Sequence, residues 1–150
     1  MKITQSRRVN AKASEIWPYL ADFGNIHRFH PKLSGSHYLN EYDSCEIGSE
    51  RQCNLKDGNF LKERVTEFKE GSYYTVEIFD SSYPIKKAIA TLGVRALEDG
   101  GTEIYMESEM EIPNPLLRPL LYLGFKYDAM PSILKGLEGL HEEEYGLQMA

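Results

Sequence analysis

The sequence has few cysteines, no long apolar run and no excess of positive charge, and each of these shortages excludes a class of protein. Its two cysteines, Cys45 and Cys53, are too few for a disulfide scaffold and lack the Cys/His spacing of a zinc site, so we expect reduced thiols and no bound metal. The best apolar window, residues 116–125, is interrupted by Arg118 and Pro119 and is shorter than the roughly 20 residues of a membrane-spanning helix. We therefore expect no integral membrane association.

The charge balance disfavours two further kinds of partner. Lys and Arg number 17 against 23 Asp and Glu, a formal charge of −6, which opposes a nucleic-acid backbone and an anionic membrane surface. Residues 1–8 alternate polar and apolar side chains without the apolar core of a signal peptide, which predicts a cytoplasmic protein. No motif indicates a cofactor, and the sequence leaves the oligomeric state open.

The first part of the chain predicts one strand and two short helices. At 150 residues, 41% of them hydrophobic, the sequence suits a single domain over residues 1–150. Residues 1–9 predict a strand, followed by a short helix that Ser14 caps and that Pro18 keeps short. A second short helix must end before Pro31, because the residue before a proline avoids helical angles.

The rest of the chain predicts six strands and a long helix. Turn residues divide residues 36–112 into six strands, and the clearest of them alternates apolar and acidic side chains over 104–112. After residues 113–115 the apolar period becomes helical, which predicts a long C-terminal helix with Pro131 as a candidate break. The predicted fold class is α+β, with seven antiparallel strands, two short helices after the first strand and one long helix.

A pocket follows from the dimensions of these elements. A helix about 10 Å wide cannot cover seven strands spaced about 4.8 Å apart unless the sheet curls around it. A curled sheet that closes on one helix leaves internal space. Such a space, mostly apolar with a few polar groups, is the usual form of a small-molecule site.

The turn at Asp57-Gly58-Asn59 predicts a hairpin that brings two charges together. We expect Leu55 to pair with Leu61 and Cys53 with Glu63, which puts Cys53, Leu55, Leu61 and Val65 on one apolar face. In this register Arg51 and Glu63 lie on the same face as diagonal neighbours. They are near enough to form a salt bridge or to hold one ligand together.

Short motifs along nearly the whole chain share the order and spacing of one known family. They comprise Val9, Ala11, Ala13, Glu15, Ile16 and Trp17, the run from Leu20 to Asn25 with His30-Pro31, the stretch from Ile47 to Arg51 continued by Asp57-Gly58 and by Leu61 to Val65, and Ser82-Tyr83-Pro84. With these motifs the chain resembles the START-related polyketide cyclase/dehydrase superfamily, which includes birch-pollen-allergen-like proteins and plant abscisic-acid receptors.

The resemblance implies a helix-grip fold, in which a seven-stranded curved antiparallel sheet wraps around a long C-terminal helix. The cavity between them would hold lipids, hormones, polyketides or other apolar molecules, and Arg51 and Glu63 match positions that often face it. No single activity is implied, because the superfamily contains binders, transporters and cyclases. One departure is Lys12, which stands where the family often has proline.

The leading hypothesis is a protein that binds or carries a small, mostly apolar molecule, with Arg51 and Glu63 orienting its polar end. The alternative for these two residues is a purely structural ion pair. The other predicted walls of the pocket are Leu61, Tyr74, Val76, Met106, Ser108, Tyr127 and Met130.

Two rival functions fit the same fold. In a cyclase or dehydratase, Glu63 is the candidate general base, assisted by Tyr74 or His27. In a protein-interaction module, the cavity is vestigial and filled by Tyr and Met side chains. His27 and His30 lie three residues apart, a spacing that suits two metal ligands or two acid–base groups. We assign no metal to them because no third ligand has convincing spacing and His37 is only a loose candidate.

Overall fold

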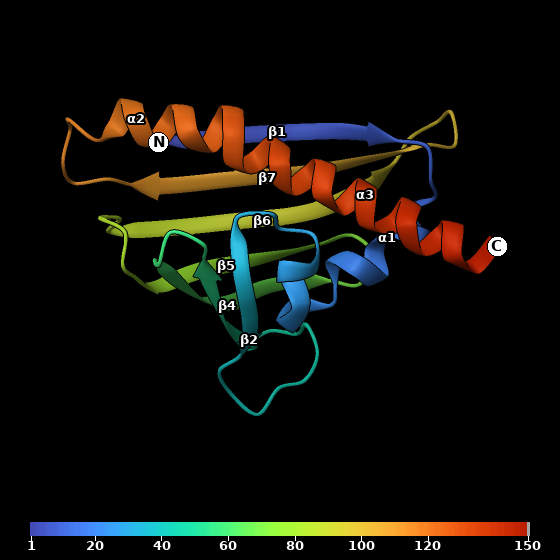
Figure 1. Cartoon of the computed structure of the whole chain (residues 1–150), viewed down its shortest axis with the longest axis horizontal. Helices are drawn as coiled ribbons and strands as arrows, with labels where there is room; N and C mark the ends of the chain where they lie inside the picture. The colour runs from blue at the N-terminus through green and yellow to red at the C-terminus, as the bar shows by residue number, and fades with distance from the viewer. Residues whose placement is uncertain (150) are drawn as a thin grey trace.

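Seven strands form one antiparallel sheet, and a long C-terminal helical segment crosses its inner face (Figure 1). The computed structural model describes residues 1–149, so Ala150 of the expected domain lies outside the described residues. In chain order the elements are β1 (Lys2–Val9), α1 (Ala13–Leu20), the 3-10 helix η1 (Phe23–Arg28), β2 (Leu33–Tyr38), β3 (Glu50–Leu55), β4 (Phe60–Lys69), β5 (Tyr73–Ser81), β6 (Lys87–Ala96), β7 (Thr102–Glu111), α2 (Arg118–Gly124), the π-helix η2 (Phe125–Ala129) and α3 (Met130–Met149).

The strand order is β1-β7-β6-β5-β4-β3-β2, so the first two strands of the chain form the two edges of the sheet. The helices α1 and η1 carry the chain from one edge to the other. Register shifts interrupt β4 between Lys62 and Glu63 and again between Val65 and Glu67. Such bulges bend and twist a strand, which suits a sheet that curves around a helix. The helix-grip α+β fold expected from the sequence is confirmed.

The β3–β4 hairpin forms where expected, but its register differs by two residues. The backbone N–H of Leu55 donates to the carbonyl of Asn59, which closes a short loop through Gly58 at a positive φ of 91°. Cys53 therefore lies opposite Leu61, and the predicted pairing of Leu55 with Leu61 is wrong. Because a shift of two residues keeps each side chain on its face, the predicted apolar face is unchanged.

The shifted register changes one relationship that matters for the site. Arg51 lies directly opposite Glu63 across the ladder, and not diagonally as expected. Directly opposed side chains on one face are the closest pairs that two antiparallel strands offer.

The first helix begins earlier than predicted. Its first residue is Ala13 and its N-cap is Lys12, whose backbone N–H donates to the Glu15 carboxylate at 3.4 Å. Ser14 lies inside the first turn, so the predicted cap at Ser14 is wrong. A glutamate that reaches back from the third helical position satisfies an N–H group that has no partner within the helix.

The C-terminal helical segment runs from α2 through η2 into α3 without a break at Pro131. The five residues before Met130 form a π-helix, and the Met130 N–H donates to the carbonyl of Phe125. A proline ring crowds the carbonyl four residues before it, and a wider turn relieves such crowding. No helix within residues 1–149 is long and apolar enough to cross a membrane.

Candidate functional site

A cavity of about 440 Å³ lies between the sheet and the segment formed by α2, η2 and the start of α3. Its volume falls within the roughly 300–1,000 Å³ of small-molecule sites. Most of its walls are apolar, with side chains from the sheet facing side chains from the helices. They include Leu61, Ile78 and Met110 from the strands and Leu121, Phe125 and Ile133 from the helical segment.

One end of the cavity is polar and is built around Arg51, which is only 1% exposed. Its Nε donates to Glu63 Oε1 at 2.8 Å, while Nη1 donates to the Phe23 carbonyl at 3.1 Å and to the Tyr74 hydroxyl at 3.3 Å. The guanidinium also lies 4.0 Å from the centre of the Phe23 ring, a cation–π contact. These contacts occupy much of the guanidinium, and its charge is already paired with a carboxylate.

Glu63 presents one oxygen to the protein and the other to the cavity. Oε1 accepts from Arg51 and from the Cys53 thiol, whose sulfur is 3.3 Å away. Oε2 accepts no hydrogen bond within the described residues. Every fully buried side-chain oxygen of these residues does have a hydrogen-bond partner. Oε2 must therefore retain some exposure, and because Glu63 lines the cavity, that exposure supplies a hydrogen-bond acceptor for a ligand.

His30 stands in the same cavity, just after η1. Burial lowers its pKa to about 4, with Glu63 acting to raise the value and Arg51 to lower it. The imidazole is therefore neutral at pH 7. Its Nδ1 accepts the backbone N–H of Lys32 at 3.3 Å, which assigns the ring proton to Nε2. His30 thus offers a neutral N–H donor beside the Glu63 acceptor.

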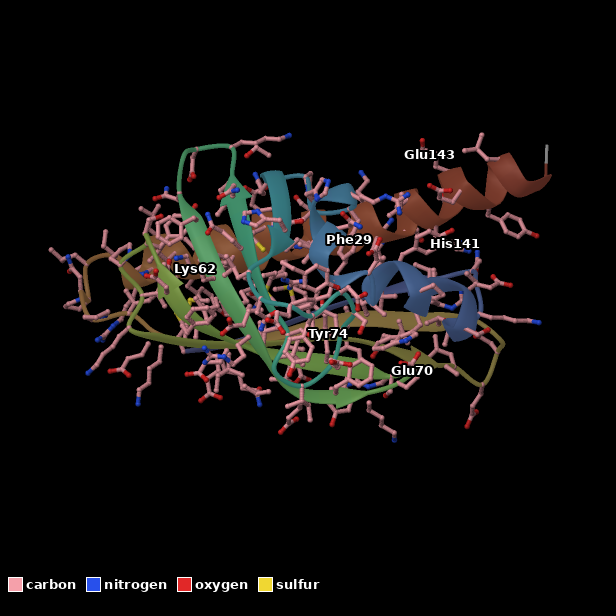
Figure 2. All side chains as sticks on the ribbon, turned by 90° about the horizontal axis from the view of Figure 1, so that it is seen from below. Phe29, Lys62, Glu70, Tyr74, His141 and Glu143 are labelled. Carbon is pink, nitrogen blue, oxygen red and sulfur yellow. The ribbon has the colours of Figure 1, made fainter. Side chains whose placement is uncertain are left out.

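The remaining polar groups near this end hold their protons. Burial raises the pKa of Cys53, and it raises the pKa of Tyr74 to about 12. Both stay protonated at neutral pH, so Cys53 is not a thiolate nucleophile. Tyr74 lies among the packed side chains of the interior (Figure 2) and is fully buried. Its hydroxyl accepts a hydrogen bond from Arg51, and Tyr74 does not line the cavity.

Paired polar groups border the cavity nearer the surface. Lys32 Nζ and Asp128 Oδ2 are 2.7 Å apart, which joins the start of β2 to η2. The Tyr83 hydroxyl donates to Asp57 at 2.7 Å, which joins the β5–β6 connection to the β3–β4 hairpin. All four residues line the cavity, and both charges of the ion pair are substantially exposed.

The structure places the predicted pocket residues in two groups. Five of the nine line the cavity, and these are Arg51, Leu61, Glu63, Met106 and Ser108. The other four do not line it. Tyr74, Val76 and Met130 are fully buried in the packed interior, and Tyr127 is 65% exposed on the surface.

Sequence reasoning missed several lining residues. The most important is His30, for which the sequence suggests only a metal-ligand or acid–base role together with His27 and not a place in the pocket wall. His27 is exposed and its Nδ1 lies 2.8 Å from the Ser36 hydroxyl, so the two rings face different surroundings. Among the described residues, no group of three His, Cys, Asp or Glu side chains could hold a metal ion. The helical residues Leu121 and Phe125 were also missed, although their apolar character was visible.

The sequence matches one family model over residues 1–143, described as polyketide cyclase / dehydrase and lipid transport. The chain belongs to this family. Its membership confirms the resemblance drawn from the motifs, and it suggests hydrophobic ligand binding without fixing a ligand. A search of curated proteins finds no match to this chain.

Solved structures share the fold of this chain at low sequence identity. A Thermobifida fusca protein has a TM-score of 0.80 and 23% identity, covering 95% of this chain and 93% of its own. The protein XoxI from Bacillus cereus has a TM-score of 0.76 and 18% identity, covering 96% and 97%. A START superfamily protein from Mycobacterium smegmatis has a TM-score of 0.73 and 17% identity, covering 95% and 98%. At these identities the likeness establishes the fold alone.

Proposed function

We propose that this protein binds a small, mostly apolar molecule carrying one uncharged polar group in the cavity between the sheet and the C-terminal helical segment. The supporting observation is the cavity itself, about 440 Å³ with largely apolar walls and a polar end at Glu63 and His30. Burial of the ligand's apolar surface supplies the affinity, and the polar end sets its orientation. The cytoplasmic location and the exclusion of nucleic acid expected from the sequence remain part of this proposal.

The polar group of the ligand is uncharged because the charges around it are already balanced. Arg51 pairs with Glu63, and His30 is neutral, so a ligand carboxylate would enter beside Glu63 without a free cation. A ligand ammonium would have to lose its hydration and share a carboxylate with Arg51. A hydroxyl or phenol avoids both costs, because it can donate to Glu63 Oε2 and accept from His30 Nε2–H.

Equilibrium dialysis at pH 7 with three probes of one shape tests this proposal. We expect 2-naphthol to bind tightest, naphthalene about tenfold more weakly for lack of the hydrogen bonds, and 2-naphthoate most weakly. Tighter binding of 2-naphthoate would contradict the uncharged polar group and favour Arg51 as a carboxylate clamp. Failure of all three probes to bind would contradict the ligand-binding function.

A matched pair of variants assigns the preference to the polar end. His30→Phe removes the cavity donor while keeping a planar ring, and it should reduce the preference for 2-naphthol over naphthalene, because only the hydrogen bond to Glu63 remains. His27→Phe makes the same change at the exposed ring on η1 and should leave the tenfold preference intact. Equal behaviour of the two variants would remove His30 from the proposed site.

The cyclase or dehydratase alternative draws support from the same pair of groups. Glu63 Oε2 is open to the cavity, and His30 is a neutral donor within the same site. The predicted helpers Tyr74 and His27 are not available there, since Tyr74 is fully buried against Arg51 and His27 is exposed. The interaction-module alternative expected a collapsed cavity and finds less support in an open one. We therefore place binding first.

A further inference from the structure

Exposed apolar side chains follow one another along α2 and the residues on either side of it. Leu116 is 85% exposed, Leu120 69%, Leu123 53% and Tyr127 65%. Leu120 and Leu123 lie three residues apart on α2 and so share one side of it, whereas Leu116 lies in the turn before the helix and Tyr127 in η2. We call these four residues the α2 stripe. No residue of α2 is buried, so this helix leaves much apolar surface in water, a cost that a free surface seldom carries.

The charged side chains within residues 112–127 are all positive. No Asp or Glu occurs between Glu111 and Asp128, whereas Arg118 and Lys126 fall within this interval. A hydrogen bond with the Tyr122 hydroxyl raises the pKa of Lys126, whose side chain is partly exposed. The segment is therefore locally cationic within a chain of net charge −6. The negative net charge of the whole chain therefore does not oppose contact between this segment and an anionic surface.

The α2 stripe also adjoins the cavity. Leu120 both belongs to the stripe and lines the cavity, and its helical neighbours Leu121 and Gly124 line it too. The same short helix thus separates the interior of the pocket from the exposed apolar face. A surface that covered the stripe would lie against this wall of the cavity.

We propose that the α2 stripe docks on the surface of an anionic lipid bilayer, with its leucines and tyrosine in the headgroup region and Arg118 and Lys126 facing the lipid charges. Amphipathic helices with leucine, aromatic and basic residues bind membranes in this way. A second copy of the chain is the less favoured occupant. In a two-fold dimer the α2 stripe would face itself, which would bring Arg118 and Lys126 of the two copies toward one another.

The other end of the helical segment provides an internal control. Tyr145 and Leu147 are 48% and 69% exposed, but they follow three consecutive glutamates, Glu142 to Glu144. Glu143 lies on the exposed end of α3 in Figure 2, far along the helix from α2 in Figure 1. This end has comparable apolar exposure with the opposite charge, so it should not bind an anionic bilayer.

Sedimentation with lipid vesicles tests the docking proposal on the full chain. We expect binding to vesicles that contain phosphatidylglycerol, weak binding to phosphatidylcholine alone, and a fall in binding as salt is raised. The double variant Leu116→Ser/Leu123→Ser changes two exposed residues that do not line the cavity. It should lower the vesicle partition at least tenfold. Lys126→Gln should lower it about fivefold.

The variant Leu147→Ser removes an equally exposed leucine at the acidic end and should bind vesicles like the wild type. Absence of binding to anionic vesicles, or an equal loss in Leu147→Ser, would overturn the proposal. Analytical ultracentrifugation without lipid tests whether a second copy of the chain covers the α2 stripe instead. A dimer that the double variant disrupts would assign the α2 stripe to self-association instead, and the proposed ligand site would be unaffected by either result.

Discussion

The interior of this protein is filled at one end and open at the other. Below α1, η1 and the middle of α3, the interior is occupied by a large cluster of buried side chains that includes Trp17, Phe23 and Tyr74. Below α2, a much smaller buried cluster of Ala88, Met110 and Ile112 borders the cavity. The same sheet supports both ends, so the difference lies in what covers it. The packed end provides rigidity, and the open end leaves room for a ligand.

The boundary between the two ends is the buried ion pair of Arg51 and Glu63, and its loss should have the largest effect. Arg51→Met leaves Glu63 without its partner and removes the contacts to Phe23 and Tyr74. Breaking one partner of a buried pair costs about 3–5 kcal/mol. Urea denaturation should therefore show a large fall in the free energy of unfolding.

The control for this prediction lies on the same hairpin. Arg64 pairs with Glu50 on the outer face, and its side chain is 43% exposed. Arg64→Met should cost no more than about 1 kcal/mol, because exposed pairs contribute little. Similar losses in the two variants would mean that Arg51 does not anchor the packed end.

His30 gives the next largest effect, in the dependence of stability on pH. Its pKa is about 4 in the folded protein and 6.5 as an ordinary histidine. Between these values the unfolded chain binds more protons, so the free energy of unfolding decreases as pH falls from 6.5 to 4. This residue alone should contribute a loss of about 3 kcal/mol over that window. Below pH 4 its contribution should no longer change.

Paired denaturation curves separate His30 from the carboxylates that titrate nearby. The free energy of unfolding of wild type and of His30→Phe should be measured by urea denaturation at several values of pH between 4 and 7. The difference between them should change across this window. A flat difference for His30→Phe would mean that the imidazole reaches water through the cavity and titrates normally.

The faces of the strands were predictable, but positions along each face were not. Alternation in β7 correctly placed Met106 and Ser108 toward the interior. On β5 the same reasoning selected Tyr74 and Val76, whereas Ile78, two residues further along the same face, is the one that lines the cavity. Periodicity identifies which side of a sheet is apolar. It contains no information on which part of that side a distant helix will cover.

The sequence also mispredicted which residues of the C-terminal helical segment face the cavity, for a different reason. The sequence predicted Tyr127 and Met130 on the turn that faces the cavity, but Asp128 and Ala129 line it. The π-helix η2 lies in between, and one extra residue in a turn rotates the preceding residues by about 100°. The sequence showed Pro131 but not how the backbone accommodates it.

Two glycines on the helical segment offer the finest comparison of the packed and open ends. At Gly136 an added Cβ would overlap the carbonyl of Phe29, whereas at Gly124, which lines the cavity, it would meet no atom within 4 Å. Gly136→Ala should therefore destabilise the protein by about 1–3 kcal/mol through overpacking. Gly124→Ala should stabilise it by about 0.5–1 kcal/mol, because alanine restricts the unfolded chain and favours the helix.

Urea denaturation of both glycine variants measures the sign directly. Opposite signs are expected because helix propensity acts equally at both positions, and only the space beside the backbone differs. If both variants were destabilised, α2 would have to lie closer to the sheet than the cavity requires. The open end would then be closed in solution, and the volume available to a ligand would be smaller than 440 Å³.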